Sequence, residues 1–178
     1  MKPSKCAPQT VLVVGPKNSG KTTYLETIID RGRARDLRIG GIVSRGQWRY
    51  QKKQEYIIQD IITGARRTLA SLHEPASPSV KVGAYYLLCS TLEWTIDILV
   101  KSIDCEVILL DEFGPLELHG RGYYPALMYL LEHYTGYLFV SVRPEVADHL
   151  KKLILTGMAP THNGSVVSKI SGSIHQLD

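Results

Sequence analysis

The sequence predicts a three-layer α/β fold, in which a mainly parallel sheet lies between helices. Largely apolar runs at residues 11–14, 107–110 and 138–142 are typical of strands that are buried on both faces. Segments with helical spacing of apolar residues separate these runs, as in alternating strand and helix units. A sheet of this kind places its ligand site at the carboxyl ends of its strands.

Helical periodicity predicts the layers that cover the sheet. In the first periodic segment Leu25, Ile28 and Ile29 share one face, as an amphipathic helix requires. The expected helices span residues 20–30, 87–100, 123–134 and 146–155, and a short final strand is expected at residues 166–174.

An antiparallel hairpin is expected to be added to the parallel sheet. Residues 39–48 and 55–63 are rich in β-forming side chains, and the polar segment at residues 51–53 separates them. Residues 64–80 contain a glycine, two prolines and three serines, which predict a surface loop.

Residues 15–22 match the pattern G-x-x-x-x-G-K-[ST], the Walker A motif or P-loop, and directly follow the first apolar run. A strand that ends here and a helix that begins near Lys21 leave backbone N–H groups around one turn, which favours a polyphosphate. Lys21 is expected at the β- and γ-phosphates and the Thr22 hydroxyl at Mg²⁺. The expected nucleotide-binding residues are Gly15, Pro16, Lys17, Asn18, Ser19, Gly20, Lys21, Thr22 and Thr23.

The apolar run at residues 107–110 ends in two carboxylates and resembles a Walker B strand. Asp111 is predicted to hold Mg²⁺ together with Thr22, and Glu112 is predicted to orient a water for attack on the γ-phosphate. Mg²⁺ is the expected cofactor, because it offsets the charge that spreads over the phosphate oxygens in the transition state. Arg143 ends the next run and is predicted as a catalytic cation at the γ-phosphate or the product phosphate, with a surface salt bridge as the alternative.

Each of the other candidate site residues has two alternative roles. Glu117 either supports the site or faces solvent. The aromatic residues Trp48, Tyr85 and Tyr86 either stack on a base or pack in the core.

Bulk properties limit the class of protein. The 178-residue chain is expected to form one domain, residues 1–178, with the hairpin inserted at about residues 39–70. Residues 1–5 lack the apolar stretch of a secretory signal, and the sequence contains no apolar run of about 18 residues, so a cytoplasmic protein without membrane contact is expected. The net charge of +4 is spread over short clusters, so no nucleic-acid partner is expected, and no pattern identifies a protein partner. The three widely spaced cysteines argue against a disulfide framework and a zinc site.

Four segments resemble the small P-loop nucleoside-triphosphatases of archaea, bacteria and animals. They comprise residues 15–23, 40–44 with 55–69, 110–118 and 142–144. The segment at residues 110–118 is the most specific, and with residues 120–127 it resembles bacterial members of the family. The resemblance implies a P-loop NTPase fold and slow, Mg²⁺-dependent hydrolysis of nucleoside triphosphates, such as ATP or GTP, to diphosphates and phosphate, with broad base tolerance.

Two other functions are compatible with these motifs. A nucleotide or small-molecule kinase has a similar size and fold, and the hairpin with residues 64–80 is placed to cover an acceptor. A GTP-binding adapter in cofactor assembly is the third interpretation, because residues 18–23 resemble the P-loop of the molybdopterin-guanine dinucleotide biosynthesis adapter. That second resemblance is limited to one motif.

Overall fold

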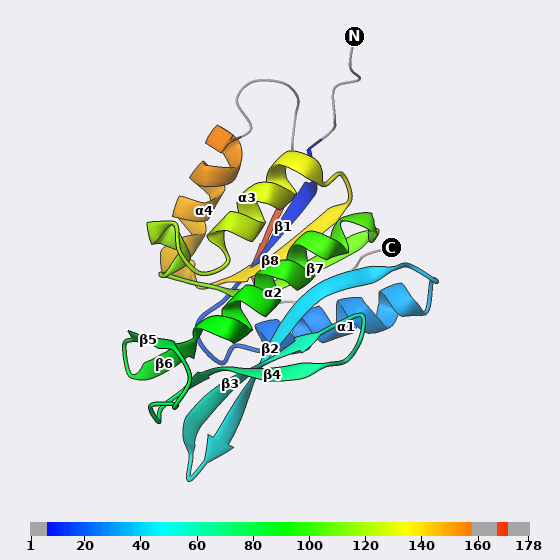
Figure 1. Ribbon diagram of the computed structural model, residues 1–178. Coiled ribbons are helices and arrows are strands. Elements are labelled where there is room, and N and C mark those ends of the chain that lie inside the picture. The colour runs from blue at the N-terminus through cyan, green and yellow to red at the C-terminus, as the bar shows by residue number, and fades with distance from the viewer. Residues whose placement is uncertain (1–6, 158–166, 171–178) are drawn as a thin grey trace.

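The computed structural model describes residues 7–157 and 167–170 of the chain. Within them lies one nine-stranded sheet with the order β5-β6-β4-β3-β2-β7-β8-β1-β9 (Figure 1). The strands are β1 (Gln9–Val14), β2 (Ile39–Arg49), β3 (Lys52–Asp60), β4 (Arg66–Ser71), β5 (Ser79–Val82), β6 (Tyr85–Leu88), β7 (Val107–Phe113), β8 (Tyr137–Val142) and β9 (Val167–Ile170). The helices are α1 (Lys21–Arg33), α2 (Cys89–Lys101), α3 (Tyr124–His133) and α4 (Pro144–Gly157), with the 3-10 turns η1 (Ser102–Asp104) and η2 (Glu117–His119).

The parallel half of the sheet lies between two layers of helices. The strands β2, β7, β8, β1 and β9 pair in parallel in that order. Leu25 of α1 packs against Val13 on one face, whereas Leu12 packs with α2, α3 and α4 residues, among them Leu99 and Leu127, on the other (Figure 1). Successive residues of β1 therefore serve two separate cores, as expected for a strand buried on both faces. The predicted three-layer α/β fold is confirmed.

The antiparallel half of the sheet begins with the predicted hairpin. Strand β2 continues beyond the parallel core and pairs with β3, and β4, β6 and β5 extend the sheet in antiparallel fashion. Tyr50 and Gln51 form the connection, with φ of 49° and 59°, the left-handed conformations of a two-residue type I′ hairpin turn. The added antiparallel hairpin is confirmed, and three further strands follow it.

Some expected boundaries were wrong. The loop expected at residues 64–80 contains β4 and part of β5, because Leu69 packs in the core and Ala70 beside it is buried. The helix expected from residue 87 begins only at Cys89, since the residues before it form β6. In the expected final strand, residue 166 and residues 171–174 lie outside the described residues.

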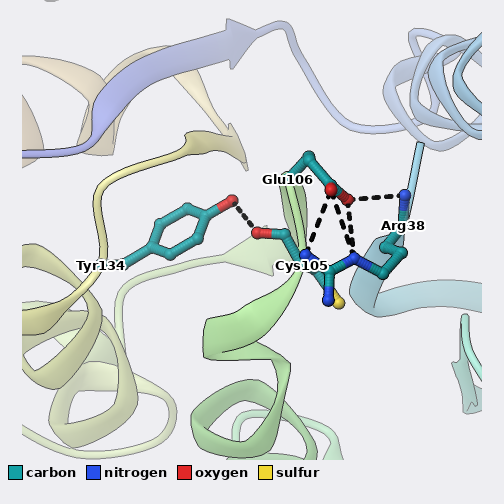
Figure 2. Close-up of polar contacts among 4 residues, drawn as sticks. All are labelled: Arg38, Cys105, Glu106 and Tyr134. Carbon is teal, nitrogen blue, oxygen red and sulfur yellow. Dashed lines mark hydrogen bonds and ion pairs between the residues drawn. The ribbon is translucent and has the colours of Figure 1, made fainter.

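A polar cluster connects the loops at the amino ends of the parallel strands (Figure 2). The main-chain N–H of Arg38 donates to the Glu106 carboxylate over 2.8 Å, and its guanidinium forms an ion pair with the same group at 3.1 Å. These bonds lower the pKa of Glu106. The Tyr134 hydroxyl donates to the Cys105 carbonyl oxygen over 3.0 Å. The cluster therefore links the residues that precede β2 and β7 with the residue that follows α3.

No helix in the described part of the chain is long and apolar enough to cross a membrane.

We expect Tyr134→Phe to lower the free energy of unfolding by about 1 kcal/mol, because the partly buried carbonyl oxygen of Cys105 loses a hydrogen-bond donor. Urea unfolding followed by circular dichroism measures this change. Tyr129→Phe in α3 is the control, because Tyr129 is exposed. If Tyr134→Phe and Tyr129→Phe unfold at the same urea concentration, the stabilising role of the Tyr134 hydroxyl is contradicted.

Candidate active site

The P-loop connects β1 to α1 at the carboxyl edge of the parallel sheet. Asn18 and Gly20 adopt left-handed conformations, with φ of 61° and 85°, which bend the chain back on itself before the helix begins. No side chain caps α1 at Gly20. The first N–H groups of the helix and its positive dipole end are therefore available to an anion.

Two polar side chains of this loop suit a phosphate group. Lys21 is 5% exposed, and its ammonium donates to the carbonyl oxygens of Gly15 over 2.9 Å and Pro16 over 2.8 Å. These bonds hold the charge within the curve of the loop. The Ser19 hydroxyl is buried and has no hydrogen-bond partner among the described residues. A buried hydroxyl without a partner is costly unless a ligand supplies one.

Asp111 is the most buried charged group of the site, with 0% exposure. Its Oδ2 accepts hydrogen bonds from the Thr22 hydroxyl over 2.7 Å and from the Ser44 main-chain N–H over 3.0 Å, and its Oδ1 accepts one from the Ser141 hydroxyl. Burial raises the pKa of Asp111, and these three hydrogen bonds oppose that rise. The carboxylate therefore connects β7 with α1, β2 and β8.

The paired oxygens of Thr22 and Asp111 fit a hard divalent cation such as Mg²⁺. The described residues contain no cluster of three or more His, Cys, Asp or Glu side chains that could hold a metal. This donor set is typical of Mg²⁺, which keeps several waters and binds through one or two protein oxygens together with substrate phosphates.

A β-bulge places Glu112 beside Asp111. In the pairing of β7 with β8, Leu110 lies opposite Val140 and Phe113 lies opposite Val142, so the two carboxylate residues share one position. Glu112 has a φ of 66°, and its main-chain N–H donates to the Ser141 hydroxyl over 2.9 Å. Successive side chains of a regular strand point to opposite faces, whereas the bulge allows both carboxylates to serve one site.

A cavity of ≈ 670 Å³, here called the first cavity, lies at this site, and the fully buried Asp111 does not line it. Predicted site residues that line it are Asn18, Ser19, Gly20, Lys21, Thr22, Thr23 and Glu112. Residues from α1 and from the β2–β3 hairpin complete its wall, namely Glu26, Ser44, Arg45, Gly46, Trp48 and Lys53. An ion pair of 2.7 Å between Arg45 and Glu26 joins the hairpin to α1 at this wall.

A second cavity of ≈ 350 Å³ shares Glu112 and Ser44 with the first. Lys17 and Arg143 line the second cavity and not the first. The Arg143 guanidinium lies 3.6 Å from the Glu145 carboxylate, so the salt bridge considered as its alternative role is present. Apart from these charged residues, most of the wall is apolar.

Glu117 is buried, which decides between its two expected environments. Its carboxylate accepts hydrogen bonds from the main-chain N–H groups of Gly114 over 2.8 Å and Tyr123 over 3.1 Å. Burial raises the pKa of Glu117, and these two bonds oppose the rise. Glu117 therefore holds the loop that follows Glu112 in shape.

The three aromatic candidates occupy different places. Trp48 is 49% exposed and lines the first cavity, whereas Tyr85 lines the second. The Tyr85 hydroxyl donates to the Lys53 carbonyl oxygen over 2.9 Å. Tyr86 lines neither of these two cavities, and its ring lies beneath the ammonium of Lys81.

Three residues at this site did not emerge from the sequence: Ser44, Ser141 and Lys53. Ser141 has a signal, because it is the one polar side chain within the buried run at residues 138–142. Ser44 acts through its main-chain N–H, which any residue other than proline could supply. The sequence pattern puts Lys53 in the polar segment between the two hairpin strands, whereas in the structure it lies within β3.

The model of a family described as NTPase matches residues 10–168. Nucleoside-triphosphatase THEP1 of Thermofilum pendens (strain DSM 2475 / Hrk 5) is 26% identical over 128 residues, which are 71% of this chain and 69% of that protein. The solution structure of a human cancer-related nucleoside triphosphatase has a TM-score of 0.65 at 19% identity, covering 90% of this chain and 87% of that one. The crystal structure of THEP1 from the hyperthermophile Aquifex aeolicus has a TM-score of 0.59 at 19% identity, covering 89% and 87%. These two structures confirm the expected fold.

Proposed function

The chain belongs to the NTPase family, and on this basis we propose that it is an enzyme that hydrolyses nucleoside 5′-triphosphates to diphosphates and phosphate. The observation that carries the proposal is the hydrogen bond of 2.7 Å between Thr22 and Asp111. It joins the P-loop helix to the end of β7, so that Lys21 and Glu112 line one cavity. Phosphate binding and water activation then belong to the same site.

The chain's own residues account for each step of hydrolysis. The P-loop N–H groups and Lys21 bind the β- and γ-phosphates. Glu112 orients a water molecule and accepts a proton from it, while the water oxygen forms a bond to the γ-phosphorus. The bond from the γ-phosphorus to the bridging oxygen breaks, and the nucleoside diphosphate leaves. Arg143 binds the departing phosphate; it lines the second cavity together with Glu112, which supports this role.

We propose that Thr22 and Asp111 hold Mg²⁺, the former directly and the latter directly or through water. When bound, Mg²⁺ neutralises charge on the β- and γ-phosphate oxygens. Ser44 and Ser141 orient the Asp111 carboxylate through their hydrogen bonds, so the protein fixes the direction of its oxygens before a cation arrives.

We further propose broad tolerance of the base, with ATP or GTP as substrate. Trp48 is the one aromatic residue among the described residues that line the first cavity. A ring face stacks on any base, because every base presents a π-face, whereas hydrogen bonds to base edges discriminate among bases.

A second candidate function is phosphoryl transfer to a small acceptor, and the second cavity favours it. Hydrolysis needs room for one water beyond Glu112, whereas ≈ 350 Å³ is within the range of small-molecule pockets. Leu69, Leu87 and Tyr85 suit an apolar or aromatic body, and Lys17 and Arg143 suit an anionic group. In this reaction an acceptor hydroxyl replaces water, and Glu112 takes the hydroxyl proton.

We expect Glu112→Gln to lower kcat for ATP hydrolysis by about 10²- to 10⁴-fold, because the amide cannot accept the proton. Binding of ATP is expected to be retained, since Lys21 and the P-loop are unchanged. Phosphate release measures kcat, and equilibrium dialysis measures binding. Lys21→Ala is the control for a contaminating activity. Full activity in Glu112→Gln would remove this carboxylate from the mechanism.

Removal of divalent cations is expected to abolish phosphate release, and added MgCl₂ is expected to restore it. Thr22→Ala is expected to raise the Mg²⁺ concentration that gives half of the maximal rate, because one cation ligand is lost. Titrations of wild type and variant with MgCl₂ measure this concentration. Unchanged activity in excess EDTA would rule out the metal-assisted mechanism.

For the second candidate function, nucleosides, nucleoside monophosphates and pyridoxine are incubated with ATP and the enzyme. Transfer is expected to yield more ADP than inorganic phosphate, whereas hydrolysis yields equal amounts. Chromatography measures ADP, and a colorimetric assay measures phosphate. Equal yields with every acceptor would limit the enzyme to hydrolysis.

A further inference from the structure

Lys53 of β3 extends its side chain into the first cavity. The residue is 9% exposed, whereas its neighbour Lys52 is exposed. Gly46 on the paired strand makes room for it, because a Cβ atom there would lie 2.4 Å from Cε of Lys53 and 3.0 Å from Nζ. The Lys53 side chain therefore lies over Gly46 and reaches the first cavity, which the P-loop also lines.

The ammonium group of Lys53 rests on aromatic rings. Its Nζ lies 4.3 Å from the ring centre of Tyr56 and 5.4 Å from that of Trp48. It makes no hydrogen bond or ion pair with any other residue in the described parts of the chain. Two π-faces stabilise the cation, and they leave its N–H donors free for a ligand.

The charges around Lys53 favour an anion in the cavity. Burial lowers the pKa of Lys53, Lys17 and Lys21 lower it further, and Glu112 is the main opposing influence. The positive charges of Lys53, Lys17 and Lys21 therefore repel one another. Their mutual repulsion is relieved when a group with several negative charges binds among them. A nucleotide's terminal phosphate has this property.

We propose that Lys53 is a further catalytic residue, whose ammonium binds the γ-phosphate from the hairpin side of the first cavity. The inference rests on the proposed function. Lys21 approaches the phosphates from the P-loop and Lys53 approaches from β3, so the terminal phosphate is held between two cations. Lys53 stabilises the negative charge that the γ-oxygens carry in the transition state. A nucleoside diphosphate has no γ-phosphate. Lys53 therefore binds the triphosphate and not the diphosphate.

The test compares Lys53→Met with Lys52→Met, because methionine keeps the apolar stem and removes the charge. Lys53→Met is expected to lower kcat/KM for ATP by about 10²-fold, as for the loss of one transition-state donor. Its affinity for the β,γ-imido analogue of ATP is expected to fall, while its affinity for ADP stays unchanged. Lys53→Arg is expected to recover part of both losses. Tryptophan fluorescence titration measures the affinities, with Trp48 next to the site.

The outcomes separate this inference from the proposed function. If Lys53→Met and Lys52→Met match wild type in kcat/KM and in affinity for the analogue, the role of Lys53 is refuted and hydrolysis stands. If Lys21→Ala is as active as wild type, the proposed function fails. Equal losses of ADP and analogue affinity in Lys53→Met would indicate a packing role and overturn the γ-phosphate contact. A urea midpoint measured for each variant verifies that it is folded.

Discussion

The site depends on one buried carboxylate. Asp111 has no exposed surface, and leaving its charge unpaired there would cost several kcal/mol. Donors from Thr22, Ser44 and Ser141 meet this requirement, and each comes from a different element. Hydrogen bonds to a buried charge are strong and directional, so α1, β2 and β8 are fixed relative to β7. The carboxylate thus sets the geometry of both the P-loop and the hairpin.

The bulge in β7 places a second carboxylate residue, Glu112, beside this anchor. Ser141 donates to Asp111 and accepts from the main-chain N–H of Glu112, so one hydroxyl fixes both carboxylate residues. A left-handed φ at a glutamate is an uncommon and strained conformation, and such conformations cluster at functional sites. Glu117 holds the following loop through two main-chain N–H groups. The cost of the strained backbone is thereby offset by hydrogen bonds on both sides.

The sequence predicts those parts of the fold and site that depend on local pattern. The three layers follow from apolar runs and helical spacing, and the P-loop lies within one contiguous segment. Asp111 could be placed beside Thr22 because parallel topology brings strand ends to one edge. Lys53 could not be predicted. Gln47 pairs with Glu55 and Trp48 pairs with Lys53, so Gln54 is an extra residue that changes the alternation of β3. Only the three-dimensional pairing reveals such a bulge.

Strand β2 belongs to both halves of the sheet and joins the parallel half to the antiparallel half. Its first residues pair with β7 over Ile39–Ile42, and its later residues pair with β3 alone. Ser44 lies where the strand leaves the parallel core, and its N–H binds Asp111. The hairpin therefore leaves the parallel core at the residue whose main-chain N–H binds Asp111. A tilt of the hairpin that turned the Ser44 amide would change this hydrogen bond, so the position of the hairpin and the environment of the Asp111 carboxylate are coupled.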